Sequence, residues 1–389
     1  LPLGFASGTL MTPDAPLVAA WAATLYYMER ALIAGRNTAW LGMGIAFGLG
    51  LLSKYTLGLL GITALLFVIL DPTARRWLKH PHPYLAAALA LLLFSPVIIW
   101  NSQNDWASFA FQSTRLLDDG YHFAVHNLIV YMMIMLTPIG LIAAGYAFFS
   151  NRNHRNDKFE DRRRLFVQIF TGVPLLTFFT LSTFDLPKFH WTGPIWLAIL
   201  PTIAWMIVQT NQFSPMVKRL QSAWQPTIIA CTFIYALVLH YIVLGIPGIP
   251  YPPQLTKHYY WRETTAEIEK IVEAVKNRTG KEPIVVGMSK WSVASALTFY
   301  TNTHMDIRSR NLFGESGAMY DYWHPSQPPT NRPIIQVGMK PIHLNQTHHG
   351  GDIRHMLKQP GAIEYRVIEH YGTLVRPVYY RVSEGVQQY

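Results

Sequence analysis

The chain has 389 residues, half of them hydrophobic and 14% charged, with a formal net charge of +10. Nucleic acid is not the expected partner of this charge, because Lys and Arg lie mostly in short segments between apolar runs, where they are typical membrane topology signals. Cys231 is the only cysteine, which excludes an internal disulfide and a site of several thiolates.

The hydrophobic pattern predicts a mainly α fold, a polytopic transmembrane helix bundle followed by a small extracytoplasmic α/β domain. We expect a membrane region at residues 1–245, a proline-rich linker at 246–258 and the α/β domain at 259–389. About eight apolar runs are expected to span the bilayer. They cover residues 15–34, 39–52, 56–70, 84–100, 126–150, 165–184, 192–209 and 224–245.

Lys54 lies in the middle of an apolar stretch from residue 39 to residue 70. A single helix through this stretch would be about 45 Å long, well beyond the ~30 Å of bilayer hydrocarbon. It would also bury the ammonium group at a cost of about 2.5 to 3.5 kcal/mol. We therefore expect two short helices that turn at Ser53 and Lys54, with the ammonium at a membrane surface.

Basic residues predict which ends of the helices are cytoplasmic. Lys and Arg cluster at 30–36, at 75–79 and at 152–164, and the positive-inside rule assigns all three clusters to the cytoplasm. The turn at Lys54 then faces the opposite side. The same alternation brings several polar sites to this extracytoplasmic face: Asp14, Lys54, the loop after Asn101, Asp185, Lys188, His190 and the C-terminal domain.

The C-terminal part has the pattern of a small α/β domain. A helix is expected at 262–279, with apolar residues at helical spacing and Gly280 as its stop. Strands are expected at 283–288, 333–339, 363–370 and 374–382, with a second helix at 293–300. It contains no nucleotide-binding or zinc-protease motif. We interpret His348, His349 and His355 as parts of an exposed loop and assign no metal ligand.

Two external lysines, Lys54 and Lys188, are the strongest candidates for binding a ligand. An ammonium group at the membrane surface can pair with the phosphate of a lipid carrier whose chain lies in the bilayer. His190 lies two residues from Lys188 and could donate to the same phosphate. The alternative is that these side chains extend to ordinary phospholipid headgroups.

Several other polar residues are candidates for the sugar or acceptor side. For Asp14 the residues leave four roles open: orienting an acceptor, binding a divalent cation, pairing with a lysine, or capping a helix. Loop capping is an equally simple role for the remaining candidates. These are Asn101, Asp105, Trp106 and Asp185, where the carboxylates and amide could bind sugar hydroxyls and the indole could stack on a sugar ring.

The chain resembles the PMT_2-type membrane glycosyltransferases, a broad GT-C family related to glycosyltransferase families 39 and 83. That family includes protein O-mannosyltransferases and lipid A aminoarabinose transferases. The resemblance rests on the order of motifs along nearly the whole chain. They are TPDAPL at 12–17, GLGLLSKYT at 48–56, SPVIIWN at 95–101 with DWASF at 105–109, KFHW at 188–191, ALTFY at 296–300 and YDYW at 320–323.

The resemblance implies transfer of a sugar from a polyprenyl-phosphate donor to an extracytoplasmic acceptor: lipid A, polysaccharide or protein. It implies a multi-pass protein of a bacterial inner membrane, with a periplasmic C-terminal domain. In this family the principal catalytic Asp or Glu follows the first transmembrane helix, which would precede residue 1 here, so Asp14 is given only a supporting role. The chain starts at Leu1 without an initiator Met, and we expect an N-terminal part to be missing.

Two functions from other classes remain as alternatives. The first is a lipid or solute transporter, which should show inverted repeats and helix breaks near mid-membrane; no repeat is evident in the sequence. The second is a non-catalytic membrane subunit whose C-terminal domain binds a partner.

Overall fold

The computed structural model describes residues 12–114, 123–150, 158–189, 191–208, 214–246, 248–252, 256, 259–324, 331–347 and 350–387. The chain divides into two compact units, Leu1–Tyr235 and Ala236–Tyr389. The first is helical, and the second combines helices with a five-stranded sheet. The expected fold class, helices followed by a small α/β region, is confirmed at this level, whereas the expected boundary at residue 245 stays a prediction.

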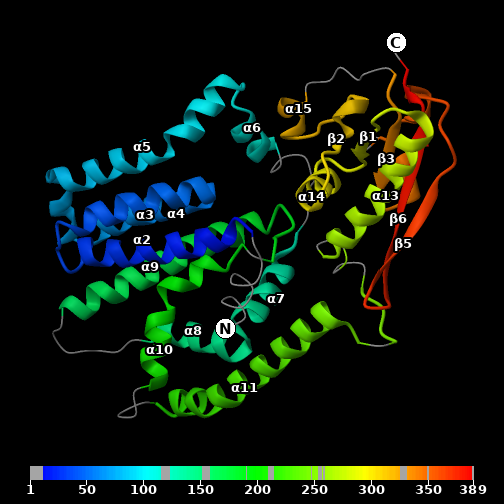
Figure 1. Ribbon diagram of the computed structural model, residues 1–389. Helices are drawn as coiled ribbons and strands as arrows, with labels where there is room; N and C mark the ends of the chain where they lie inside the picture. The colour runs from blue at the N-terminus through cyan, green and yellow to red at the C-terminus, as the bar shows by residue number, and fades with distance from the viewer. Residues whose placement is uncertain are drawn as a thin grey trace. The chain divides into compact units, whose positions relative to one another are not determined.

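The first unit is built from apolar helices, several of which run side by side (Figure 1). α3 packs between α2 and α5, and α4 packs against α9. The helices are α2 Asp14–Leu32, α3 Ala39–Ser53, η1 Tyr55–Leu57, α4 Gly58–Leu70, η2 Ala74–Lys79, α5 Pro81–Gln103, α6 Ala107–Thr114, α7 Val125–Leu136, α8 Pro138–Phe149, α9 Lys158–Leu181, η3 Pro194–Ala198, α10 Leu200–Val208 and α11 Pro215–Leu244. The last turns of α11 belong to the second unit.

Some of these helices have the length and composition of membrane spans. Within the described residues, α5, α11 and the segment Phe159–Leu181 of α9 are long and apolar enough to cross a bilayer, and α7 with α8 would make a fourth if the bent pair is one span. α3 and α4 are shorter apolar helices. The expected total of about eight spans therefore stays a prediction.

The apolar run expected to span the bilayer at 126–150 is not one continuous helix, because it breaks into α7 and α8 with a bend of 99°; that it crosses the bilayer stays a prediction. Pro138 begins α8, and the residue before a proline is disfavoured in the helical region. That residue, Thr137, has φ +67°. Its hydroxyl caps the new helix by accepting from the backbone N–H of Gly140 at 3.1 Å.

Two further expected helices have different bounds in the structure. The run at 192–209 contains Pro194 and Pro201, and it divides into η3 and α10 because each proline removes a backbone donor. α11 begins at Pro215, well before the expected start at residue 224. The prediction missed these first turns because they carry polar residues, which hydropathy alone does not assign to a helix. Pro96 lies inside α5, which remains one helix.

Small residues allow α3 and α5 to approach closely. A Cβ atom at Gly44 would lie 2.7 Å from the backbone oxygen of Ala86, and one at Gly48 would lie 3.0 Å from the Cα of Ala90. Glycines four residues apart thus face alanines four residues apart, which is the small-residue packing that membrane helices use.

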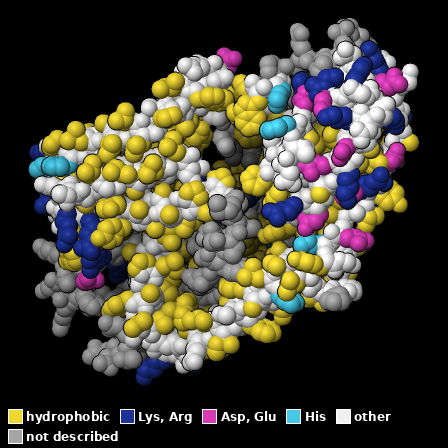
Figure 2. Space-filling view, viewed as in Figure 1, with side chains coloured by type: hydrophobic (Ala, Val, Ile, Leu, Met, Phe, Trp, Pro, Cys, Tyr) yellow, Lys and Arg dark blue, Asp and Glu magenta, His cyan; other side chains and the backbone are white. Residues whose placement is uncertain are grey.

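The helices of the first unit have a basic end. Figure 2 shows Lys and Arg gathered at the left-hand edge of these helices, while hydrophobic side chains cover the surfaces between. At this end Arg162 of α9 donates from Nε to Asp71 Oδ2 at 2.7 Å and from Nη2 to the Leu32 carbonyl at 2.6 Å. Phe67 of α4 packs on Phe166 of α9, with ring centroids 5.5 Å apart.

These contacts orient the helices relative to one another. α4 ends at Leu70 and α9 begins at Lys158, both beside Asp71, so the two helices run antiparallel. The start of α4, just after Lys54, and the end of α9 at Leu181 therefore lie at the opposite end. The structure thereby separates the basic end from the end that carries Lys54, as the pattern of charges predicts.

The second unit contains a mixed sheet with strand order β2-β1-β3-β6-β5, in which β1 pairs in parallel with β2 and β3, and β6 pairs antiparallel with β3 and β5. Strands β4 and β7 form a separate pair. The elements are α13 Trp261–Thr279, β1 Ile284–Gly287, α14 Ser292–Tyr300, β2 Asp306–Ser309, η4 Arg310–Phe313, α15 Tyr320–Trp323, β3 Ile334–Gly338, η5 Pro341–Leu344, η6 Arg354–Met356, β4 Leu357–Lys358, β5 Glu364–His370, β6 Thr373–Ser383 and β7 Gly385–Val386.

The expected helices and strands of this unit are confirmed within one or two residues. The predicted apolar face of α13 is buried against the sheet, together with residues of α14. β2 was not expected, because it is only four residues long and carries Asp306 and Arg308.

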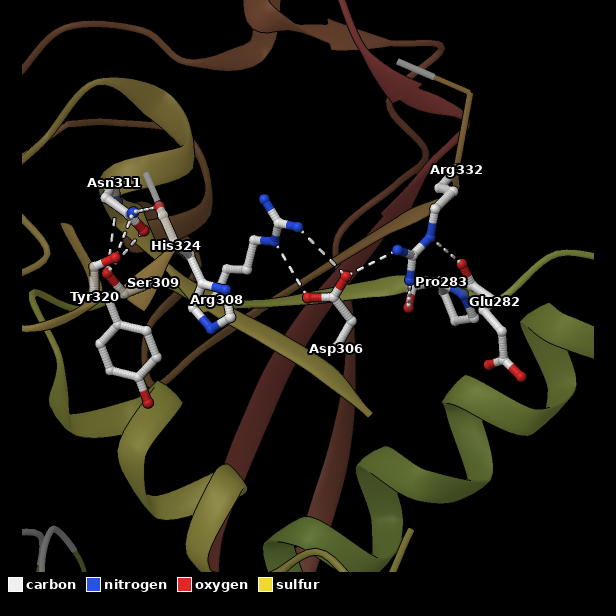
Figure 3. Close-up of polar contacts among 9 residues, drawn as sticks. All are labelled: Glu282, Pro283, Asp306, Arg308, Ser309, Asn311, Tyr320, His324 and Arg332. Carbon is white, nitrogen blue, oxygen red and sulfur yellow. Dashed lines mark hydrogen bonds and ion pairs between the residues drawn. The ribbon is translucent and has the colours of Figure 1, made fainter. Parts of the chain in front are cut away.

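Two polar clusters support β2 and the segment after it (Figure 3). The carboxylate of Asp306 lies between two guanidinium groups, 3.1 Å from Arg308 Nε and 2.8 Å from Arg332 Nη1. The buried amide of Asn311 donates to the backbone oxygens of Tyr320 at 3.1 Å and His324 at 2.8 Å. The first cluster joins β2 to the segment before β3 through Arg332, and the second ties η4 to the residues of and just after α15.

The end of α11 is bonded directly to the α/β part of its unit. The Tyr260 hydroxyl donates to the carbonyl of Ile242 at 2.8 Å. His370 lies 2.7 Å from Glu263 Oε1 through Nδ1 and 3.0 Å from the carbonyl of Val243 through Nε2. These bonds hold α13 and β5 at the end of the long apolar helix.

Candidate active site

The start of α2 meets the end of α3, and this meeting brings two sequence candidates together. Lys54 Nζ lies 2.6 Å from Asp14 Oδ1, and both side chains are largely buried, with exposed fractions of 26% and 16%. Beside them the Ser53 hydroxyl donates to the backbone oxygen of Pro13 at 2.6 Å. These two bonds, from Ser53 and Lys54 to Pro13 and Asp14, join segments that are forty residues apart in the sequence.

The backbone around Lys54 explains why the ammonium reaches this point. α3 ends at Ser53, Lys54 is extended with φ −162° and ψ 131°, and η1 starts at Tyr55. The expected break in the apolar stretch is confirmed. Phe47 of α3 would touch a Cβ placed at Gly61 of α4, so the two helices form a hairpin with Lys54 at its turn.

Asp14 does not cap α2 with its side chain. The N-cap position belongs to Pro13, and Asp14 lies in the first helical turn. Unpaired N–H groups at a helix start favour a nearby negative charge, so the carboxylate is stabilised both by α2 and by Lys54. Of the four roles left open by the sequence, the structure shows the pairing with a lysine.

Tyr55 and Ser108 connect the hairpin to the turn after α5. The Tyr55 hydroxyl lies 2.8 Å from Ser108 Oγ, and Ser108 Oγ donates to Asn101 Oδ1 at 2.9 Å. The ring of Tyr55 lies between Phe94 and Phe109, with centroid distances of 5.8 and 5.2 Å. Sequence reasoning assigned no role to Tyr55 or Ser108, although both lie in the motifs quoted above.

Asn101 stabilises this turn with hydrogen bonds from its buried side chain. Its side chain is fully buried, its Nδ2 donates to the Val97 carbonyl at 2.9 Å, and its Oδ1 accepts from Ser108. Its backbone oxygen also accepts from the N–H of Trp106 at 2.8 Å. The expected sugar contact of Asn101 stays a prediction, and in this geometry it requires the amide to exchange partners.

Asp105 and Trp106 occupy a strained turn at the surface. Their φ values are +50° and +54°, in the left-handed region that non-glycine residues rarely adopt. Both residues are exposed, and the Trp106 ring lies 5.9 Å from that of Phe109. Strain of this kind costs about 1–3 kcal/mol per residue and tends to cluster at ligand sites. The geometry presents a carboxylate and an indole side by side.

The segment after α9 carries the remaining candidates. Ala124 N donates to the Ser182 carbonyl at 2.9 Å, which fixes the start of α7 beside the end of α9. Asp185 Oδ1 accepts from the N–H of Leu186 at 2.6 Å. Lys188 is half-buried, and its carbonyl accepts from Trp191 N at 3.0 Å. His190 lies outside the described residues.

The structure thus places Lys188 and Asp185 at the same end of the helices as Lys54, because α9 runs antiparallel to α4. Among the contacts of the described residues, none joins this segment directly to Lys54. Asp14, Lys54, Tyr55 and the turn at 101–109 therefore form the assembled part of the site.

Chemically, the assembled part is a lysine–aspartate ion pair followed by the aromatic cluster around Tyr55. The bond to Asp14 uses one of the three ammonium protons of Lys54. Within the described part of the chain no acceptor is found for the other two, so the ammonium can bind a phosphate oxygen while Asp14 keeps it in place. Charge-assisted bonds of this type are among the strongest hydrogen bonds in proteins.

Comparison with known proteins relates the first part of the chain to a glycosyltransferase family. Residues 1–100 match the PMT_2 family model, described as dolichyl-phosphate-mannose-protein mannosyltransferase. The expected resemblance to PMT_2-type, GT-C membrane glycosyltransferases is thereby confirmed, and the matched stretch contains Asp14, Lys54 and Tyr55.

A curated relative extends the similarity along the chain. The chain is 25% identical over 275 residues to the lipopolysaccharide core galacturonosyltransferase RgtA of Rhizobium johnstonii. The match covers 67% of this chain and 53% of RgtA, so the chain spans about half the length of this relative. No solved structure matches the chain significantly.

Proposed function

We propose that the protein is a PMT_2-type membrane glycosyltransferase that moves a sugar from a polyprenyl-phosphate donor to an extracytoplasmic acceptor. The observation that carries this proposal is the Lys54 ammonium, held by Asp14 at the end of the helices opposite the arginines. A lipid-linked phosphate has its charge at the bilayer surface, where this ammonium would meet it.

Lys54 would act on the leaving group. When the glycosidic bond breaks, the polyprenyl phosphate gains negative charge, and a preorganised cation lowers the energy of the transition state. Lys188 and His190 are proposed as further donors to this phosphate. Asp14 would position Lys54.

The aromatic turn after α5 is proposed as the sugar side of the site. Asp105 can accept hydrogen bonds from sugar hydroxyls, and Trp106 offers an exposed ring for stacking. Asn101 and Asp185 remain candidates for the same side. The divalent cation left open by the sequence is not required for this scheme, since Lys54 supplies the positive charge.

The name of RgtA favours one class of acceptor. It describes transfer to the core of lipopolysaccharide, so we propose a cell-envelope saccharide or glycolipid rather than a protein as the acceptor. The proposed location is a bacterial inner membrane, with the Lys54 end and the C-terminal unit on the periplasmic side.

One observation favours a transporter as the second candidate. The break between α7 and α8 is the type of interrupted helix from which transporters build binding sites. A transporter would move the lipid-linked sugar across a vesicle membrane without cleaving it, so the product distinguishes the two functions.

The test is a transfer assay with the complete protein in membranes and a radiolabelled polyprenyl-phosphate sugar. We expect Lys54→Ala to lower kcat/KM at least about a hundredfold, mainly through kcat, because charge develops in the transition state. Lys54→Arg should retain part of the activity, because it keeps the charge but not the compact shape.

Lys79→Ala, at the basic end, is the matched control and should transfer sugar at the wild-type rate. Wild-type turnover by Lys54→Ala would overturn the proposed phosphate site. Intact labelled donor recovered inside the vesicles, with no product, would favour the transporter.

A further inference from the structure

A cavity lies in the first unit, at the end opposite Lys54. It has a volume of about 870 Å³ and opens between α2, α8, α9, η3 and α10. This volume is within the usual range for ligand pockets. None of its lining residues belongs to the candidate active site, so it calls for a separate explanation.

The walls of this cavity, here called the lower cavity, have two distinct parts. Apolar side chains form much of the lining, among them Leu25, Leu197, Trp205 and Met206. The ends of α2 and α9 instead contribute six charged side chains, Glu29, Arg30, Glu160, Asp161, Arg163 and Arg164. An amphipathic ligand, with a polar head and an apolar chain, matches such a lining.

The arginines at the rim are paired with neighbouring carboxylates. Arg163 bonds Glu29 at 3.0 Å and Glu160 at 3.4 Å. Arg30 lies 3.8 Å from Glu29, and its guanidinium stacks over the ring of Tyr26 at 5.3 Å. Three guanidinium groups and three carboxylates give the rim no net charge.

The guanidinium of Arg30 is only partly engaged by the protein. Its Nε is buried, without a hydrogen-bond partner among the described residues, and lies 3.8 Å from Glu29 Oε2. The side chain as a whole is 36% exposed, so a ligand phosphate would approach the outer nitrogens of the guanidinium and not the buried Nε. A purely anionic head would, however, also meet the carboxylates of Glu29 and Asp161.

From this balance we propose that the lower cavity binds one glycerophospholipid with a phosphoethanolamine head. The phosphate lies at Arg30 and Arg163, the ammonium lies at Asp161 and Glu160, and an acyl chain follows the apolar wall past Trp205. The zwitterionic head complements both signs of charge at the rim.

This lipid would be a structural cofactor distinct from the sugar donor. It joins α2 and α9 on the far side of the helices, so its loss should loosen their packing without removing a group from the Lys54 site. The proposal does not depend on glycosyl transfer.

The experiment is native mass spectrometry of the complete, delipidated protein in detergent, titrated with phosphatidylethanolamine or with phosphatidylglycerol. We expect one bound phosphatidylethanolamine and clearly weaker binding of phosphatidylglycerol. Arg30→Gln should weaken phosphatidylethanolamine binding about tenfold, the value of one charge-assisted bond. Lys218→Gln, on the exposed part of α11, is the matched control.

A second variant separates binding from folding. Ala147→Phe fills the apolar part of the lower cavity without changing a charge, and it should block the lipid while the lipid-free melting temperature stays within a few degrees of wild type. Absence of a retained lipid, equal binding of both headgroups, or unchanged binding in both cavity variants would each overturn the proposal.

Discussion

Asp14 shows how a single side chain acquires its role from tertiary contacts. By sequence it could cap a helix, orient an acceptor, bind a cation or pair with a lysine. In the structure Pro13 holds the cap position, and the carboxylate lies 2.6 Å from Lys54 Nζ. The residue therefore belongs to the phosphate-binding group that we propose, as the partner that positions its ammonium.

The environment of Asp306 predicts how the stability of the second unit depends on pH. Burial alone would raise its pKa, but the hydrogen bonds and charges of Arg308 and Arg332 outweigh it and hold the pKa below the usual value. A carboxyl with a depressed pKa stabilises the fold above its unfolded pKa of about 3.9, and this contribution is lost as pH falls through the lower folded value.

We therefore expect Asp306→Asn to lower the melting temperature of the second unit at pH 7, by an amount equivalent to about 1–2 kcal/mol. The difference from wild type should shrink as the pH falls below the unfolded pKa and through the lower folded pKa of Asp306, because the wild-type carboxyl becomes protonated as well. Thermal unfolding at pH 7 and in this acidic range measures it. Asp352→Asn is the comparison: Arg354 lowers the pKa of Asp352 to about 2, but this pair is exposed, so its loss should matter less.

At the scale of elements, the α3–α5 contact depends on the absence of side chains. Replacing a helical glycine by alanine normally stabilises a helix by about 0.5–1 kcal/mol. At Gly48 the added Cβ would meet Leu93 Cβ at 2.9 Å and Ala90 Cα at 3.0 Å, whereas at Gly145 of α8 nothing lies within 4 Å.

The two substitutions should thus have opposite signs. Gly48→Ala should lower the melting temperature of the protein in detergent, and Gly145→Ala should leave it equal or higher. Equal shifts for both would show that α3 and α5 are not in close contact. Because α3 ends at Ser53, loosening this pair should also weaken the Asp14–Lys54 contact and with it the proposed transfer.

At the scale of the whole molecule, the separation of charges predicts a topology. The Lys54 end carries the candidate site, and the other end carries arginines of η2 and α9. Since basic clusters face the cytoplasm, we expect the two ends on opposite sides of the membrane and the C-terminal unit on the side of Lys54.

Single cysteines test this topology in a Cys231→Ser background. On intact cells, a membrane-impermeant maleimide should label Gln103→Cys at the Lys54 end and Lys281→Cys in the second unit. Arg76→Cys should react only after the membrane is permeabilised. Labelling of position 76 in intact cells, or protection of position 281, would contradict the proposed site.

The sequence by itself determined the elements whose cause is local. Apolar length and the cost of a buried ammonium predicted the break at Lys54, and period and turn residues predicted α13, α14 and four strands of the second unit. Local signals failed at two places. The apolar run at 126–150 looks continuous by hydropathy but is interrupted at Thr137 and Pro138, and β2 is too short and too charged to show a strand pattern.

Only the tertiary structure decided which side chains meet. Lys54 reaches Asp14, and Tyr55 reaches Ser108, across forty or more residues, and no local pattern encodes such a pairing. These contacts follow from how closely α3 can approach its neighbours, which is governed by the glycines and alanines between them. Composition therefore supplied the charges of the site, and helix packing brought them together.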